Sequence, residues 1–312
     1  MAALGRPGYI TLGHADDLKK DYSEAAMENH AHDVMDAAWN GGVRYFDTAR
    51  SYGLAEKFLT SWLSKRKMSR DAVTIASKWG YTYTADWKVH AAMHEIKDHS
   101  LPVLQRQWRE SKELLGEYLR VYQIHSTTLE TGALENAGVL NELAGLRNEG
   151  ICIGLTVTGP EQATTLLRAM TVKIDGIPLF GIVQATWNLL EQSVGSALAE
   201  AHAAGMGVVI KESLANGRLT ERNQNPTFAS KLALLKTEAS RLNCSIDALP
   251  LASVLAQPFV DVVLSGATTS TQLHSNLQAE KLSLDADTLS RLNKICEPAT
   301  EYWAMRKSMP WN

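Results

Sequence analysis

The feature that most constrains the fold of this chain is a regular alternation of short apolar segments with longer amphipathic ones. Most of the short segments are nearly continuous runs of Val, Ile and Leu. Such runs are typical of strands that are buried on both faces of a parallel sheet. The predicted strands are residues 43–47, 73–78, 121–125, 152–156, 181–184, 207–211 and 260–266.

Amphipathic stretches with helical periodicity lie between the predicted strands, for example over residues 55–65, 103–115 and 139–147. Repeated strand-then-helix units along an uninterrupted chain are typical of a β/α barrel or of a doubly wound sheet. No GxGxxG sequence is present, so a dinucleotide-binding Rossmann sheet has no local support. Because α/β barrels commonly reach about 250 residues or more as one unit, we predict a single-domain α/β protein, a (β/α)8 TIM barrel, over residues 1–312.

The start of the chain is short for this fold. An eight-stranded barrel requires one more strand than the seven segments supply, and only residues 1–4 could form it. Strands typically run about five or six residues. We therefore expect a truncated first strand beside the strand that ends at Gly266. We also expect a lower stability than that of a chain carrying a full strand in this place.

Composition excludes several classes of protein. The formal net charge of −3 offers no basic field for nucleic acid or for a membrane surface. The three cysteines, Cys152, Cys244 and Cys296, are widely spaced and form no CxxC pair, so neither a disulfide framework nor a metal site is predicted. No apolar run approaches the roughly 20 residues of a membrane helix. We expect a cytoplasmic protein, as a monomer or a small homo-oligomer.

Polar side chains follow the ends of three successive predicted strands. Asp47, Lys78 and His125 end these strands, and Tyr52 follows Asp47 by five residues. Barrel enzymes keep their active sites at this end of the sheet. A free tyrosine titrates at about 10, and a neighbouring ammonium would lower that pKa toward neutrality. The group could therefore act as a general acid and base.

Each of these residues also has a structural interpretation. Asp47 could cap the following helix, and Lys78 could be a solvated charge at the rim. Tyr52 could pack in its loop, and His125 could be a core histidine bonded to the backbone. Their agreement at successive strand ends favours the catalytic interpretation.

Longer motifs around these residues point to one family. FDTARSYG at 46–53 with Glu56, ASKWG at 76–80 and VYQIHS at 121–126 resemble the tyrosine, lysine and histidine motifs of the aldo-keto reductase family. Matches continue through IGLT, QATWNLLEQ and VLSGATTSTQLHSNLQA to residue 279. The resemblance implies an NAD(P)(H)-dependent oxidoreductase acting on an aldehyde, ketone or sugar. It also implies a catalytic tetrad of Asp47, Tyr52, Lys78 and His125, with Tyr52 as the proton donor or acceptor.

The resemblance also implies a cofactor site without a metal. The segment 266–270 opens a helix where barrels bind phosphate. Lys211 stands where the family commonly stacks an aromatic ring on nicotinamide, so we expect it to point elsewhere or to meet the substrate. Thr268 and Gln272 are neutral where a basic residue often grips a 2′-phosphate, which favours NAD slightly over NADP. The implied cofactor residues are Thr156, Gln184, Lys211, Leu214, Asn216, Arg218, Gly266, Thr268, Gln272 and Asn276.

Aromatic residues near the tetrad suggest a flat or sugar-like substrate. The candidates are Trp79, Tyr81, Trp87 and Trp303, although tail aromatics can simply pack against a barrel. An alternative function is a nucleotide-binding regulatory or sensor barrel with little turnover. A phosphate-sugar isomerase barrel would need a glutamate base at a strand end, and no predicted strand ends in glutamate.

Overall fold

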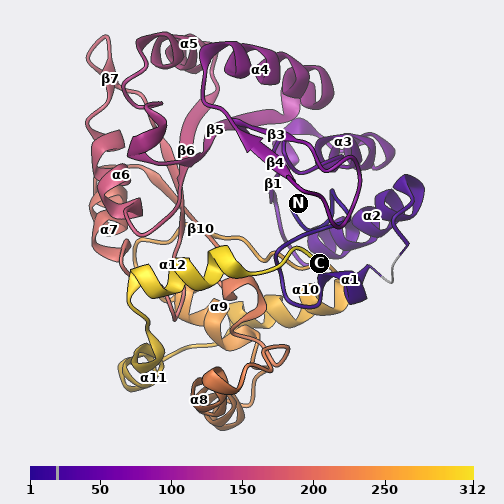
Figure 1. Cartoon of the computed structure of the whole chain (residues 1–312), viewed down its shortest axis with the longest axis vertical. Coiled ribbons are helices and arrows are strands. Elements are labelled where there is room, and N and C mark those ends of the chain that lie inside the picture. Colours follow the sequence, from indigo (N-terminus) through magenta and orange to yellow (C-terminus); the bar gives the residue numbers. More distant parts are fainter. Residues whose placement is uncertain (19–20) are drawn as a thin grey trace.

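The computed structural model describes residues 1–18 and 21–312, and its centre is a curled parallel sheet ringed by helices (Figure 1). The strand order is β1-β2-β5-β6-β9-β10-β11, so strands that follow one another along the chain are also neighbours in the sheet. Each connection therefore returns over a helix to add the next parallel strand on the same side. The strands are β1 Tyr45–Asp47, β2 Thr74–Trp79, β5 Leu119–Thr127, β6 Cys152–Val157, β9 Ile182–Thr186, β10 Gly207–Lys211 and β11 Val262–Val263.

The helices lie outside the sheet and bury their apolar faces against it. All seven predicted strands are confirmed, although β11 is shorter than expected, and α3 has the predicted bounds. No helix of the described residues is long and apolar enough to cross a membrane. The helices are α1 His14–Asp17, α2 Glu24–Asn40, α3 Ala55–Lys65, α4 Leu101–Leu115, α5 Ala137–Asn148, α6 Gln162–Met170, α7 Gly195–Ala203, α8 Ala229–Arg241, α9 Ala248–Leu255, α10 Ser270–Leu277, α11 Ala286–Leu292 and α12 Ala299–Ser308.

The expected first strand does not form. The amide N–H groups of Leu4 and Gly5 both donate to the carbonyl oxygen of Met1, so this segment is a turn whose donors are used locally. Gly5 packs so closely on the loop after β1 that a Cβ atom would lie 2.2 Å from the Tyr52 carbonyl oxygen. Among the described residues nothing pairs β11 with β1, and the sheet is an open, curled seven-stranded barrel rather than a closed eight-stranded one.

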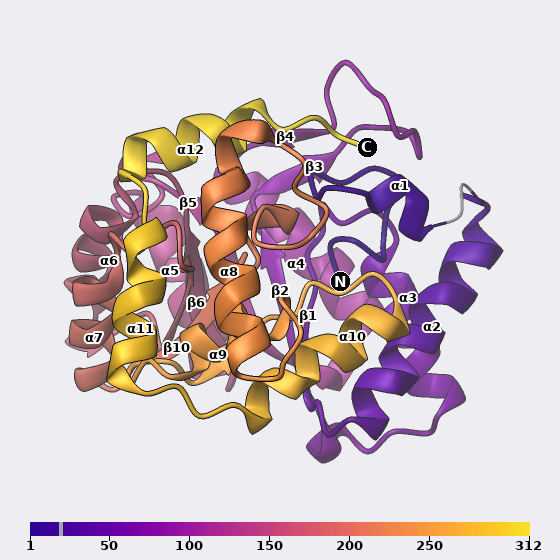
Figure 2. The same ribbon diagram turned by 90° about the horizontal axis from the view of Figure 1, so that it is seen from below.

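Three segments form a rim above the carboxyl ends of the strands. An antiparallel hairpin, β3 Tyr81–Tyr83 with β4 Glu95–Lys97, and helix α12 lie at the same end of the molecule (Figure 2). The third segment runs through Tyr9, whose amide and carbonyl groups exchange two 3.0 Å hydrogen bonds with the backbone of Asn312. The rim therefore joins the early and late parts of the chain. A second small hairpin, β7 Lys173–Ile174 with β8 Ile177–Pro178, lies apart from it.

Candidate active site

A cavity of about 1730 Å³ extends from the carboxyl ends of the strands along β1 and β11, the two edges of the open sheet. One end is lined by Tyr52 and His125, and the other by Thr268 and Asn276. Strand curvature and the rim segments together enclose it. The cavity is long enough to join two functions, namely polar chemistry at the first end and binding of an elongated ligand toward the second.

Asp47 and Lys78 form a buried ion pair at the base of the first end. The Lys78 side chain is fully buried, and its Nζ donates to Asp47 Oδ2 and, at 2.9 Å, to the Thr48 carbonyl oxygen. The Gln184 amide donates to Asp47 Oδ1 at 2.9 Å. Burial lowers the pKa of Lys78, and the Asp47 carboxylate counters part of that shift. Asp47 thus holds the buried Lys78 ammonium in place beside the cavity.

Tyr52 lies above this ion pair. Its ring centroid is 4.9 Å from Lys78 Nζ, and its hydroxyl is 3.4 Å from His125 Nε2. Burial and, secondarily, the Asp47 charge raise the pKa of Tyr52 well above its ordinary value, while Arg6 lowers it. The expected net lowering by a neighbouring ammonium is not seen here, because burial and the Asp47 charge outweigh the effect of Arg6. At neutral pH the phenol is protonated and able to donate.

His125 faces Tyr52 near the end of β5. Its ring nitrogens lie 3.4 Å from the Tyr52 hydroxyl and 3.5 Å from Ser51 Oγ. Burial, reinforced by the charge of Lys78, holds the pKa of His125 well below its ordinary value. The imidazole is therefore neutral at pH 7, with one N–H to donate and one nitrogen to accept.

Glu56 anchors the loop that carries Tyr52. The side chain is only 2% exposed and pairs with Arg50. It also accepts hydrogen bonds from Ser77 Oγ at 2.5 Å and Ser111 Oγ at 2.7 Å. These contacts tie the loop after β1 to β2 and α4, and so fix the position of Tyr52.

Replacing Glu56 with Gln should destabilise the fold. The substitution leaves the half-buried Arg50 without its buried partner, and breaking a buried pair typically costs about 3–5 kcal/mol. Glu110 provides the matched control, because it binds the same guanidinium but is 40% exposed. Glu110→Gln should cost less than about 1 kcal/mol. Urea unfolding of both variants measures the difference, and equal losses would contradict an anchoring role for Glu56.

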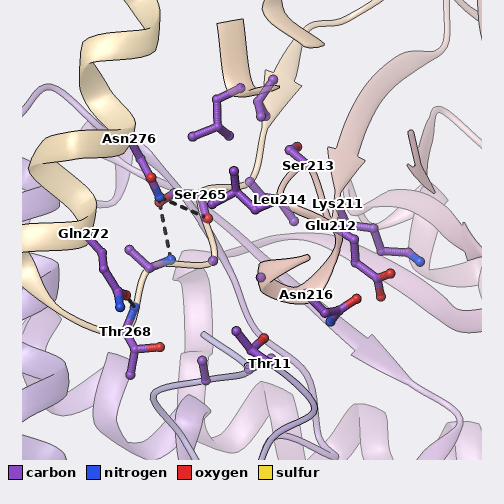
Figure 3. A pocket seen from close by; sticks show the side chains of 18 of the residues that line it. Thr11, Lys211, Glu212, Ser213, Leu214, Asn216, Ser265, Thr268, Gln272 and Asn276 are labelled. Carbon is purple, nitrogen blue, oxygen red and sulfur yellow. Dashed lines mark hydrogen bonds between the residues drawn. The ribbon is translucent and has the colours of Figure 1, made fainter. Parts of the chain in front are cut away.

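The far end of the cavity is built around the start of α10 (Figure 3). Thr269 caps this helix, and Gln272 completes a capping box by accepting from the backbone N–H of Thr269 at 3.3 Å and of Thr268 at 2.8 Å. Asn276 donates to Ser265 Oγ at 2.8 Å. Gly266 adopts a φ of +67°, and an added Cβ would meet nothing within 4 Å. The backbone here can approach a ligand closely.

Several polar atoms at this end have no partner within the described chain. Ser213 Oγ, Asn216 Oδ1 and Asn276 Oδ1 are buried and make no hydrogen bond there. All three residues line the cavity, together with Leu214. Buried polar groups normally find partners. These atoms therefore suit the hydroxyl and amine donors of a nucleoside, and the residues present fit a nicotinamide nucleotide.

The structure brings together most of the predicted cofactor residues but not all. Gln184 and Lys211 line the cavity beside the tetrad. Arg218 does not contact it, because its guanidinium binds Glu297 at 2.8 and 2.9 Å. Thr156 is fully buried, its Oγ1 accepts from the Ser126 amide at 2.6 Å, and it does not line the cavity, so its role in cofactor binding stays a prediction.

Two of the four predicted substrate residues lie in the cavity wall, namely Tyr81 and Trp303. Trp79 is fully buried behind the sheet and packs edge-on to His99. Trp87 donates its indole N–H to the Tyr22 carbonyl oxygen at 2.5 Å. Neither tryptophan lines the cavity. In the described part of the chain no group of three or more acidic, His or Cys side chains could hold a metal ion.

Sequence reasoning missed the ion pairs around the cavity. Arg6 donates to Glu95 at 2.9 Å and packs against the Tyr52 ring at 5.3 Å. Glu212 pairs with Arg306, and Asp17 with Arg222. The partners are far apart along the chain, so their spacing carried no signal. Within the sequence, only the charged residues Glu95 and Lys97 of the segment HEIKDHS, residues 94–100, indicated a polar wall here.

Comparisons with known proteins agree with this geometry. A model described as "Aldo/keto reductase family" matches residues 10–297. The chain is 25% identical to "Uncharacterized oxidoreductase YrpG" of Bacillus subtilis, over 86% of this chain and 87% of the relative. It is 26% identical to "D-threo-aldose 1-dehydrogenase" of a Pseudomonas species, over 68% of each.

A solved structure shows the same fold. The holo form of aldo-keto reductase AKR11C1 from Bacillus halodurans superposes with a TM-score of 0.71 at 21% identity, covering 93% of this chain and 91% of that one. The sheet, the strand-end residues and the family match over nearly the whole length lead to one conclusion. This chain belongs to the aldo/keto reductase family.

Proposed function

We propose that this protein transfers hydride reversibly between NAD(P)(H) and an aldehyde, a ketone or a sugar, with Tyr52 as the general acid and base. The observation that carries the proposal is the convergence of a protonated Tyr52, a neutral His125 and the buried Lys78–Asp47 pair at one end of an elongated cavity. A general acid beside a hydrogen-bond donor is what carbonyl reduction requires from the protein.

The chain's own residues have distinct tasks in this reaction. The carbonyl carbon accepts the hydride that reduced nicotinamide supplies when bound, and the carbonyl oxygen takes a proton from the Tyr52 hydroxyl. The N–H of neutral His125 orients the oxygen and stabilises its growing negative charge. Lys78, held by Asp47, stabilises the phenolate that remains. Solvent then reprotonates Tyr52, and the product is the alcohol. Oxidation runs through the same groups in reverse.

The remainder of the cavity would hold the cofactor. Gly266, Thr268 and Asn276 would face the adenosine half, and Leu214 and Asn216 would cover the pyrophosphate. Gln184 is tied to Asp47 and would place the nicotinamide carboxamide beside the tetrad. On the substrate side, Tyr81 and Trp303 offer aromatic surfaces for a sugar ring or a flat aldehyde. The name of the Pseudomonas relative, an aldose dehydrogenase, supports the inclusion of sugars.

The direct test is a screen of aldehydes, ketones and aldoses with both NAD(H) and NADP(H), followed by cofactor absorbance. We expect turnover of at least one substrate class with one cofactor. Turnover by no compound in either direction, in protein that binds the nucleotide, would contradict the proposal and favour a sensor role.

The residues at the end of the cavity beside α10 predict that the protein uses NAD(H) at least as efficiently as NADP(H). Asp17 lies in the cavity wall, where its carboxylate accepts from the Gln272 amide at 2.9 Å and neutralises Arg222. Arg222 also lines the cavity, and its pairing with Asp17 leaves little positive charge to attract a 2′-phosphate. Asp17→Asn should therefore raise the relative kcat/KM for NADP(H) about tenfold, the effect of roughly 1.4 kcal/mol.

Asp16 serves as the matched control, since it is the adjacent acid on α1 and is exposed. Asp16→Asn should leave cofactor choice unchanged. A hundredfold preference of the unaltered protein for NADP(H) would show that a basic residue reaches the 2′-phosphate despite Asp17.

A further inference from the structure

The wall of the cavity beside the tetrad contains four buried or half-buried cationic side chains. Arg6 comes from the first residues, Lys97 from β4, Lys211 from the end of β10 and Arg306 from α12. Four separate segments thus each contribute a cationic side chain to this wall of the cavity. This concentration is notable in a chain whose formal net charge is −3.

Two of these cations are neutralised by neighbouring carboxylates. Arg6 binds Glu95 at 2.9 Å. Arg306 binds both oxygens of Glu212, at 2.8 and 3.0 Å from its Nε. Within residues 1–18 and 21–312, Lys97 and Lys211 have no carboxylate within 4.0 Å. Two ammonium groups therefore remain without an ion-pair partner on this wall.

Lys211 is the deeper of the two ammonium groups. Its Nζ donates to Thr186 Oγ1 at 2.8 Å and lies 5.9 Å from the Trp303 ring centroid. An ammonium has three donors, and this contact uses one of them. Burial lowers the pKa of Lys211 to about 8, so most of the population is still charged at pH 7. Its charge also lowers the pKa of His125, so it acts on the residue that orients the carbonyl.

Lys97 lies on the rim hairpin, opposite Tyr81. Its Nζ lies 5.7 Å from the Tyr81 ring centroid, and that ring is 5.0 Å from the His125 ring. Burial lowers the pKa of Lys97, and the exposed Glu130 opposes this only from beyond ion-pair distance. A ligand held at His125 would therefore lie near Tyr81 and within the influence of both ammonium groups.

We propose that the substrate carries an oxyanion, a carboxylate or a phosphate, in addition to its reacting carbonyl, and that Lys211 binds this group with Lys97 contributing from the rim hairpin. The inference rests on the proposed function and names its substrate class. An ammonium removed from water is stabilised best by an anion, and charge-assisted hydrogen bonds are the strong ones. Lys211, which does not stack on nicotinamide as an aromatic ring would, thus becomes a determinant of specificity.

The test compares charged aldehydes with neutral ones of similar shape. Succinic semialdehyde is paired with its methyl ester, and glyceraldehyde phosphate with glyceraldehyde. We expect a preference in kcat/KM of about 10- to 100-fold for the charged member of at least one pair. The pair that shows it distinguishes a carboxylate from a phosphate substrate. In Lys211→Met the ratio of kcat/KM between the charged and the neutral member should fall at least tenfold, mainly through a higher KM of the charged one.

Two further variants control for structural effects. Lys211→Arg keeps the charge and should retain most of the preference. Lys112 also lies near a tryptophan, 5.8 Å from the Trp108 ring, but on the exposed face of α4. Lys112→Met should leave the preference unaltered. Equal use of charged and neutral aldehydes by the unaltered protein, with no change in Lys211→Met, would overturn the inference while leaving the proposed function intact.

A binding measurement separates this inference from the proposed function. Succinate and inorganic phosphate have no reducible carbonyl, and their affinity is measured by calorimetry with NAD⁺ present. Binding that is lost in Lys211→Met but kept in Lys112→Met would support an oxyanion site even if no aldehyde were turned over. Equal binding of both anions to Lys211→Met and to the unaltered protein would overturn it.

Discussion

Replacement of Tyr52 with Phe is expected to lower kcat for carbonyl reduction by about 10²- to 10⁴-fold, the usual contribution of a positioned general acid. The substitution removes one hydroxyl and keeps the ring that packs beside Lys78 and Arg6. The hydroxyl has one hydrogen-bond partner in the described chain, the weak 3.4 Å contact with His125. Cofactor affinity and thermal stability should therefore remain nearly unchanged.

Steady-state kinetics and fluorescence titration of the nucleotide measure the two expectations separately. Tyr83 provides the control, since it lies in the nearby hairpin and its hydroxyl has no partner among the described residues. Tyr83→Phe should keep full activity. If Tyr52→Phe retains the unaltered rate on every substrate, the assignment of the general acid is wrong.

Replacement of Lys78 with Met should reduce activity at least as strongly. It removes the charge that would stabilise the Tyr52 phenolate, and it leaves the Asp47 carboxylate buried with only the Gln184 amide as a side-chain partner. The pKa of Tyr52, already raised by burial, should rise further. Alcohol oxidation requires the phenolate, so the profile of residual oxidation should move to higher pH.

The pH dependence of kcat/KM in the oxidation direction measures this shift. Folding is checked in parallel, because an unpaired buried carboxylate costs about 3–5 kcal/mol. Lys57→Met is the comparison, since Lys57 forms an exposed pair with Glu24 on the outer face of α3. An unshifted profile in a folded Lys78→Met protein would count against coupling between the two residues.

The sheet could be predicted from sequence because its strands are buried on both faces. A strand such as 207–211 must then be apolar throughout, and that signal does not depend on distant partners. Helix α9 shows the opposite case. Residues 248–254 are all buried, so the helix has no polar face and produces no amphipathic pattern. The missing first strand was also beyond prediction, because the turn at Met1 depends on the fit of Gly5 against the loop after β1.

The tetrad could be predicted because strand ends of a parallel sheet meet at one edge. Trp79 was predicted to contact the substrate, but successive side chains of a strand point to opposite faces of the sheet. Lys78 points toward Asp47, and Trp79 is fully buried and packs against His99. Arg218 was misplaced for a different reason. Its partner Glu297 lies 79 positions further on, and sequence gives no sign of such a contact.

The pairing of Tyr9 with Asn312 has a consequence for how the rim above the cavity assembles during folding. These residues are 303 positions apart, so their pairing closes a very long loop of the chain. Contacts of such separation form late, once the local strand-and-helix units have condensed. The same connection rests on a few partly exposed hydrogen bonds, and such regions open at lower free energy than a packed core. We therefore expect the rim above the cavity to assemble late and to open more readily than the sheet that holds Asp47 and Lys78.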